Sequence, residues 1–202
     1  EDDNFQNSNV VNRSNLLGSV LTPDQLKSIE EGQEFLTAKP GKSSPILDKC
    51  NCSYQERLTE ILTKQHEAFV ELTQFMIDQT RLRQYKNVNL ALTAFQKFLA
   101  IHLAIENTHI YKYIESYARA LQELTQKPED LKLFKKHEKM ASTLYSDMRK
   151  INTVIRAFYR EFKNEQGLFD VSESDSARFI DALSNKIAPM MIERVNVEHS
   201  QL

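Results

Sequence analysis

Glycine and proline are scarce in this sequence of 202 residues, which contains only 4 glycines and 5 prolines. Average proteins contain roughly 12% of the two together. Their scarcity excludes collagen-like chains and low-complexity disorder. It also argues against turn-rich all-β folds, because such folds need these residues at many turns. Long helices joined by few loops fit this composition better.

Cysteine is also rare, and both cysteines lie in Cys50-Asn51-Cys52. Two cysteines so close in sequence are poor partners for a disulfide, and no second pair exists to complete a structural zinc site. We interpret them as ordinary thiols. The chain begins with Glu1 and carries no hydrophobic signal segment. The cytoplasm is therefore favoured as the compartment, and a cleaved signal peptide stays as the alternative.

Charge and long apolar runs are limited as well. The 26 basic and 28 acidic residues give a net charge of −2, which is no signal for direct binding of nucleic acid. No apolar run approaches the roughly 20 residues of a membrane span, so none is expected. The sequence shows no Ser-His-Asp set, phosphate loop or glycine-rich fingerprint. These absences favour a binding protein over an enzyme.

The sequence divides into an extension, residues 1–53, and a main domain, residues 54–202. Residues 1–20 are rich in Asn, Asp and Ser without periodicity. Thr22-Pro23-Asp24-Gln25 then supplies a cap, a first-turn proline and a capping-box glutamine, which predicts a short helix over about 22–36. The Pro- and Gly-containing segment 39–45 breaks the chain before the main domain begins.

Four longer helices are predicted in the main domain, at about 55–81, 88–122, 128–163 and from about 172 onward. In each stretch the apolar residues recur at spacings of three and four, which places them on one face of a helix. We therefore predict an all-α protein. Its architecture is an antiparallel up-down-up-down four-helix bundle with an N-terminal helical extension.

Polar residues lie on or beside the apolar stripes of all four helices: His66, His102, Glu106, His137, Arg194 and Glu198. A buried carboxylate costs several kcal/mol unless a cation or a proton balances it. Two carboxylates facing one bundle axis therefore require a positive partner. A metal ion bound by both glutamates and the three histidines is one candidate. The guanidinium of Arg194, bridging the glutamates without any metal, is the other.

The height of each residue along its helix tests this convergence. His66 and His102 lie equally far from the loop that joins their helices, and so do His137 and Glu198 from theirs. Glu106 and His137, by contrast, lie at unequal distances from the loop between their helices. The two distances differ by roughly 16 Å at a rise of 1.5 Å per residue. That difference closes only if residues 117–127 form a turn rather than straight helix.

The order of these residues resembles the hemerythrin-like, or HHE cation-binding, family. The matching segments are Lys64-Gln65-His66-Glu67, Ile101 to Glu106 with its His-x-x-x-Glu spacing, Lys136-His137-Glu138, and Glu198. The resemblance covers about 150 residues. It implies a mono- or dinuclear non-haem iron centre that binds dioxygen or serves in oxygen or iron sensing or storage. In the fourth helix Arg194 stands where the family has histidine, which puts a second iron in doubt.

The same fourth helix is similar to that of bacterial anti-sigma regulators of the sigma-D type. Met190 to Glu198 contains their Arg-hydrophobe-x-hydrophobe-Glu signature, and Phe95 to Tyr111 has a similar apolar spacing. This second resemblance implies a metal-free interaction protein, with a sigma factor as partner and Arg194 occupying the site. Neither family has an extension like residues 1–53.

Overall fold

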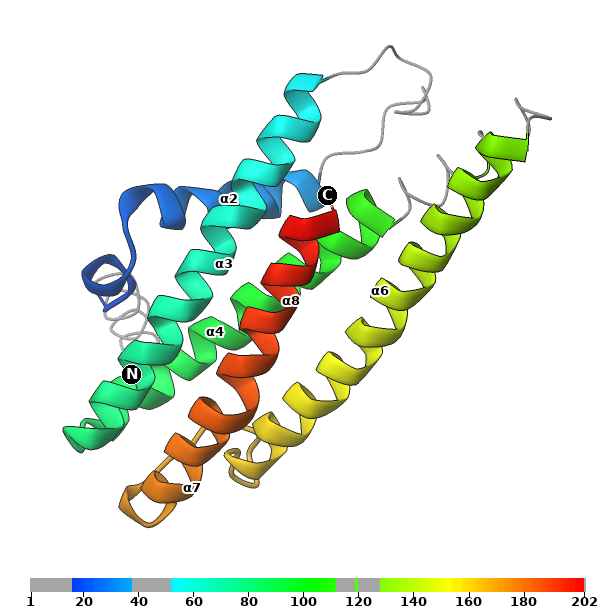
Figure 1. Cartoon of the computed structure of the whole chain (residues 1–202). Helices are drawn as coiled ribbons and strands as arrows, with labels where there is room; N and C mark the ends of the chain where they lie inside the picture. Colours follow the sequence, from blue (N-terminus) through cyan, green and yellow to red (C-terminus); the bar gives the residue numbers. More distant parts are fainter. Residues whose placement is uncertain (1–15, 38–51, 112–118, 120–127, 202) are drawn as a thin grey trace.

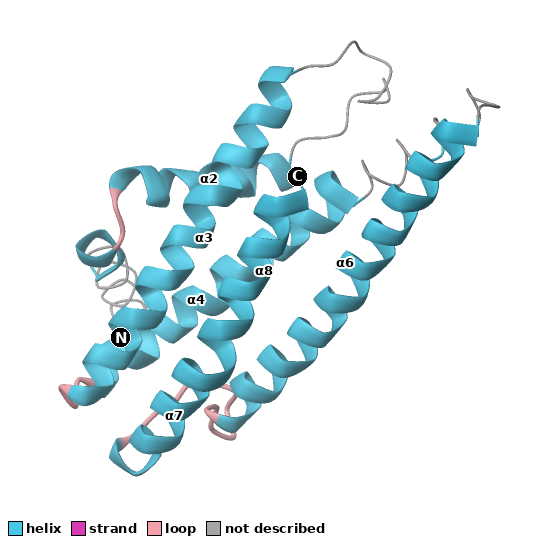
Figure 2. Cartoon of the chain, in the orientation of Figure 1, coloured by secondary structure: helices cyan, strands magenta, loops and turns pink. Residues whose placement is uncertain are grey.

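The computed structural model describes residues 16–37, 52–111, 119 and 128–201 of the chain. Within these ranges the protein is almost entirely helical and contains no strand, only an isolated bridge between Lys163 and Phe169 (Figure 1, Figure 2). The all-α class predicted from the scarcity of glycine and proline is confirmed.

The first labelled helix, α2, spans Pro23–Thr37, where the sequence predicts a short helix. Its capping box forms as expected: the backbone N–H of Gln25 donates to Thr22 Oγ1 over 3.2 Å, and that of Thr22 donates to Gln25 Oε1 over 2.8 Å. Helix α2 packs against both α3 and α4, and in Figure 1 it crosses behind α3. The described helix of the extension, α2, is thus part of the packed structure.

Helices α3 (Cys52–Arg81) and α4 (Tyr85–Ile105) form a tightly packed hairpin. Arg83 lies in the short connection between them with φ of 58°, a left-handed conformation that reverses the chain in few residues. Phe69 from α3 stacks on Phe98 from α4 and meets Phe95 edge to face. These aromatic contacts fix the two helices in the register that positions the polar residues described below.

Two segments of π-helix interrupt the α-helical path. Segment η1 (Glu106–Tyr111) directly continues α4, and η3 (Leu183–Ile187) separates α7 (Ser176–Ala182) from α8 (Ala188–Gln201). A π-helix adds one residue to a turn and is frequent at functional sites. Neither was predicted, because the apolar stripes were projected at the constant 100° per residue of an α-helix.

Helix α6 (Pro128–Glu161) and the C-terminal segment complete the described chain. A 3₁₀ turn, η2 (Glu173–Asp175), leads into α7 and is closed by a Ser172–Asp175 capping box. Phe158 from α6 stacks on Phe179 from α7. Helices α7 and α8 pack against α3, and α6 approaches η1. Helices α3 and α6 lie within a few residues of the predicted positions, and the end of the helix predicted over about 88–122 lies outside the described residues.

Helix α4 together with η1 is more apolar than expected. The 27 residues Tyr85–Tyr111 are long and apolar enough, by length and composition alone, to cross a membrane. A segment that passes these two measures was not expected from the sequence. About 44% of the most apolar window is buried inside the protein, against neighbours that include α2 and α3. A helix buried between other helices needs this composition for packing alone.

Tyr159 on α6 provides a test of the packing. Its side chain is buried, and its hydroxyl has no hydrogen-bond partner among the described residues. Burial raises the pKa of the Tyr159 phenol above its ordinary value of 10.0. The neutral form is favoured in the folded protein, so this contribution to stability is complete below about pH 10 and is lost as the pH rises further.

We therefore expect Tyr159→Phe to raise the free energy of unfolding by about 1 kcal/mol at pH 7, because it removes a buried hydroxyl without a partner. The difference in free energy of unfolding between Tyr159→Phe and the wild type should grow by about 1.4 kcal/mol per pH unit above pH 10. Urea unfolding of both proteins at pH 7 and pH 11 measures it. The same difference at the two pH values would contradict the prediction.

Candidate metal centre

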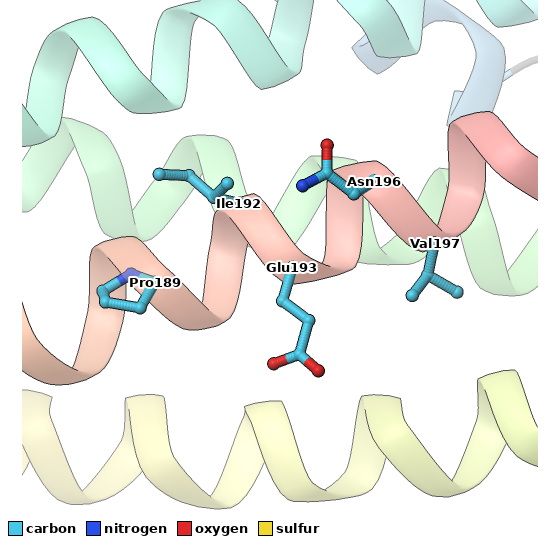
Figure 3. Close-up of a pocket in the computed structure, with 5 residues that line it drawn as sticks. All are labelled: Pro189, Ile192, Glu193, Asn196 and Val197. Carbon is cyan, nitrogen blue, oxygen red and sulfur yellow. The ribbon is translucent and has the colours of Figure 1, made fainter.

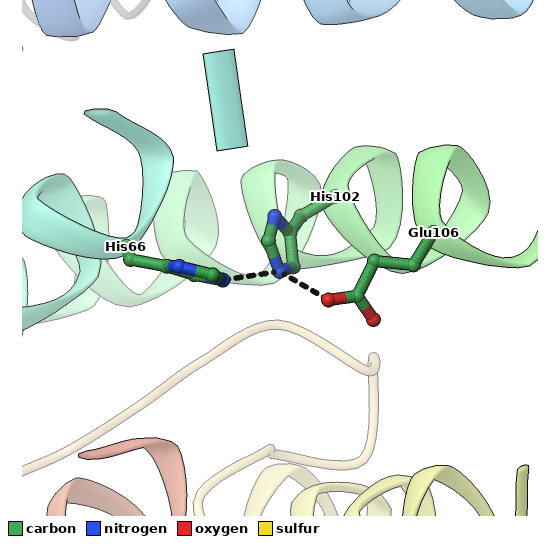
Figure 4. A group of neighbouring side chains, drawn as sticks. All are labelled: His66, His102 and Glu106. Atoms are coloured by element: carbon green, nitrogen blue, oxygen red, sulfur yellow. Dashed lines mark hydrogen bonds and ion pairs between the residues drawn. The ribbon is translucent and has the colours of Figure 1, made fainter. Parts of the chain in front are cut away.

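Three buried side chains from two helices converge in the hairpin core: His66, His102 and Glu106 (Figure 4). Nε2 of His102 lies 3.2 Å from Nε2 of His66 and 3.2 Å from Oε1 of Glu106. One potential ligand atom of each residue lies within 4.8 Å of the other two. This is the donor set, two imidazoles and one carboxylate, that transition metals prefer.

The local structure explains why these residues meet. His102 and Glu106 are four residues apart, so they lie on one face at the junction of α4 and η1. His66 reaches them from α3, and its ring meets that of His102 edge to face with centroids 4.8 Å apart. Phe69, one turn further along α3, also contacts the His102 ring. The group is therefore buried beside an aromatic ring of the core.

Gln65 determines which nitrogen of His102 carries the proton. The Gln65 amide NH₂ donates to the backbone carbonyl of Ser28 over 2.9 Å, so its oxygen faces the other way. That oxygen lies 2.9 Å from Nδ1 of His102. A carbonyl oxygen only accepts, so Nδ1 must be the protonated nitrogen. The lone pair of Nε2 then points at His66 and Glu106.

With this tautomer, two hydrogen-bond acceptors, Nε2 of His102 and the carboxylate of Glu106, face each other. A neutral imidazole presents a lone pair to the Glu106 carboxylate at 3.2 Å, and two acceptors at that distance repel each other. A second proton on His102, a proton on Glu106 or a cation between the two groups relieves the repulsion. For bonds of about 2.1 Å, neighbouring ligand atoms lie about 3.0 Å apart in octahedral and 3.4 Å apart in tetrahedral geometry. The two distances of 3.2 Å lie between these values.

The second oxygen of Glu106 faces a different pair of residues. Tyr111 donates its hydroxyl hydrogen to Glu106 Oε2 over 3.1 Å. The guanidinium of Arg194, on α8, lies 3.8 Å from the same oxygen and donates to the Tyr111 hydroxyl. All three side chains are buried. Arg194 thus balances the charge of Glu106 from the side opposite the histidines, as the sequence predicts for a cation in the core.

Of the five predicted ligands, the structure brings three together. His66, His102 and Glu106 form the group, whereas the side chains of His137 on α6 and Glu198 on α8 lie outside the described part of the structure. The turn proposed over 117–127 also lies outside it, apart from residue 119. Arg194 lies at ion-pair distance from Glu106, whereas its predicted bridge to Glu198 lies outside the described part of the structure.

Sequence reasoning missed two buried contributors, Gln65 and Tyr111. Tyr111 lies five residues after Glu106, which at 100° per residue puts it about 140° around an α-helix. The wider turn of η1 brings residues five apart onto one face, so its hydroxyl reaches the carboxylate. Gln65 is fully buried beside His66, and a polar residue next to a candidate ligand was its only signal.

A surface hollow of about 640 Å³ lies elsewhere, along α8 (Figure 3). Its lining residues all come from that helix: Pro189, Ile192, Glu193, Asn196 and Val197. Glu193 points towards α6 in Figure 3, whereas its neighbour Arg194 is buried against Glu106. The hollow includes none of the three clustered residues. The candidate site is therefore the buried group and not this hollow.

Comparison of the chain with protein-family models, with curated proteins and with solved structures finds no significant match. The function is therefore inferred from the geometry of His66, His102 and Glu106.

Proposed function

We propose that this protein is an antiparallel four-helix bundle of the hemerythrin-like type that binds one non-haem iron ion through His66, His102 and Glu106. The orientation of His102 carries the proposal. Gln65 holds Nδ1 protonated, so Nε2 offers its lone pair towards a second imidazole and a carboxylate, each 3.2 Å away. A metal ion would satisfy all three ligand atoms at once.

The ligand set supports iron as the metal. Two histidines and one carboxylate with positions left open are typical of non-haem Fe(II) sites, although imidazole also binds zinc, copper and nickel. Iron held in this way would supply an open coordination position at which dioxygen could bind. The protein's own residues orient Nε2 of His102 towards the other two ligand atoms, exclude water and balance the Glu106 charge. These roles suit an oxygen or iron sensor or store without turnover.

The position of Arg194 supports one iron rather than two. Glu106 can bind a metal through Oε1 while Oε2 keeps its hydrogen bond from Tyr111 and its ion pair with Arg194. A second metal bridged by the same carboxylate would need the Oε2 side, where the guanidinium lies. The proposed centre is therefore mononuclear.

Anaerobic titration with Fe²⁺ tests the proposal. We expect one tightly bound iron per chain in the wild-type protein and none in His102→Ala, because the central ligand is lost. Glu67→Gln is the matched control, since Glu67 is exposed and follows His66 on α3; it should bind iron as the wild type does. Failure of the wild-type protein to bind Fe²⁺ above the level of His102→Ala would refute the proposal.

A second candidate function is a metal-free interaction protein that resembles an anti-sigma regulator. The buried pair between Arg194 and Glu106 favours it, because an arginine can neutralise the carboxylate without a metal. Elemental analysis of purified protein discriminates the two. Absence of iron together with a complex with a sigma factor would support the second candidate, and bound iron would support the first.

A further inference from the structure

Helix α2 is connected to the candidate metal centre through hydrogen bonds. Its Ser28 is buried, and the backbone carbonyl of this residue accepts the Gln65 amide hydrogen bond. Gln65 in turn accepts from Nδ1 of His102. The chain Ser28–Gln65–His102 thus runs from the extension, across α3, to the central ligand on α4.

The close approach of α2 at this point depends on Gly32. A Cβ atom at position 32 would lie 2.7 Å from Gln65 Nε2 and 2.7 Å from Cδ1 of Ile105, closer than real Cβ contacts. Ile105 directly precedes Glu106, and Gln65 directly precedes His66. One glycine therefore lets α2 pack on the residues next to two candidate ligands. Gly18, by contrast, has no atom within 4 Å of the corresponding position.

The capping box and an ion pair keep Ser28 in place. Thr22 and Gln25 close the first turn of α2, and the Ser28 hydroxyl donates to the Gln25 carbonyl over 2.7 Å. Arg57 of α3 pairs with Glu31 of α2 over 3.2 Å. The carbonyl that orients Gln65 therefore belongs to a helix attached at several points and not to a loop.

We propose that α2 and the positioning residue Gln65 set the metal affinity of the centre by holding His102 in its Nδ1-protonated tautomer. The proposal rests on the metal-binding function proposed above. With α2 docked, the Ser28 carbonyl allows the Gln65 amide only one orientation. When α2 moves away, the amide can turn and present its NH₂ group to His102. Nδ1 then becomes the acceptor, the proton moves to Nε2, and Nε2 no longer offers a lone pair to a metal.

Three variants separate this role from simple packing. Gln65→Leu removes the acceptor for Nδ1. Gln65→Glu restores this acceptor and replaces the NH₂ group that donates to the Ser28 carbonyl, so it tests the contact with His102 apart from the contact with α2. Gly32→Ala displaces the Gln65 side chain, and because both clashing atoms are ends of flexible side chains the protein should still fold. Gly18→Ala is the control, because the same substitution there meets nothing.

Competition between each protein and a chromogenic chelator for Co²⁺ gives the affinities. We expect Gln65→Leu and Gly32→Ala to weaken Co²⁺ binding roughly 10- to 100-fold, as loss of a partner to a ligating histidine does. Gln65→Glu should recover most of the loss, and Gly18→Ala should bind as the wild type does. Equal affinity of wild type and Gln65→Leu, or no recovery in folded Gln65→Glu, would overturn the proposal.

¹⁵N NMR of the metal-free protein at about pH 8 tests the tautomer without any metal. We expect the proton on Nδ1 of His102 in the wild type and in Gly18→Ala, and loss of this preference in Gly32→Ala and Gln65→Leu. A wild-type His102 with its proton on Nε2 alone would refute the role of Gln65. If the wild type shows the Nδ1 proton and binds no Co²⁺ or Fe²⁺, the metal-binding function fails while the positioning role stands.

Discussion

Glu106→Gln is expected to abolish metal binding and to destabilise the fold by about 3–5 kcal/mol. An amide loses the negative charge that pairs with Arg194 at 3.8 Å, so the buried guanidinium loses this ion pair. The same change removes the only carboxylate among the three clustered ligands. We expect the Co²⁺ dissociation constant to rise at least about 100-fold. Urea unfolding and chelator competition measure the two effects.

Two further proteins make this result specific. Glu67→Gln makes the same chemical change at an exposed position of α3 and should alter the free energy of unfolding by less than about 0.5 kcal/mol. The double variant Glu106→Gln/Arg194→Met removes both buried charges and should recover most of the lost stability without recovering metal binding. Equal free energies of unfolding of Glu106→Gln and Glu67→Gln would show that the ion pair between Arg194 and Glu106 does not stabilise the fold.

The helices could be predicted from the sequence because their apolar residues follow a simple period. Leu58, Leu62, Phe69, Leu72 and Met76 recur at three- and four-residue steps on α3, and all are buried. Local signals also placed α2, since its capping box acts within a few residues. Periodicity and capping depend only on neighbours in the sequence, so both can be recognised without knowledge of the tertiary contacts.

The candidate site could be predicted only in part. His66, His102 and Glu106 are polar residues on or beside predicted apolar stripes, and burial of such residues indicates a partner. The contact of Tyr111 with Glu106 depends on the extra residue per turn in η1, and a projection at 100° per residue does not reproduce it. Gln65 depends on the Ser28 carbonyl 37 residues earlier in the chain. Contacts of this kind follow from tertiary packing, so a pattern within one helix could not reveal them.

In the proposed centre Arg194 would limit the number of irons, and its replacement should change that number. Its terminal nitrogen lies 3.8 Å from Glu106 Oε2, the oxygen that a second, bridged metal would use. Two unit charges 4 Å apart repel by about 4 kcal/mol at an effective dielectric constant of 20, and a divalent ion doubles that figure. We therefore expect the wild-type protein to hold one iron per chain at saturation.

Arg194→His should raise the iron content towards two per chain, because it removes the cation and supplies an imidazole on the same side of Glu106. Arg194→Ala removes the cation without supplying a ligand. It should stay at one iron and destabilise the metal-free protein by about 3–5 kcal/mol, since Glu106 loses its buried ion pair with the guanidinium. Ile192→His introduces a histidine on the same helix at an exposed position and should change neither quantity.

Elemental analysis after anaerobic loading with Fe²⁺, together with urea unfolding of the metal-free proteins, distinguishes these outcomes. Two irons in the wild-type protein would mean that the guanidinium moves away from Glu106 on loading, which contradicts the proposed role of Arg194. A single iron in Arg194→His, with wild-type stability, would contradict it as well. A rise in iron content in Arg194→His but not in Ile192→His would instead show that the charge and position of Arg194 exclude the second metal. The comparison is direct because both variants introduce a histidine on the same helix.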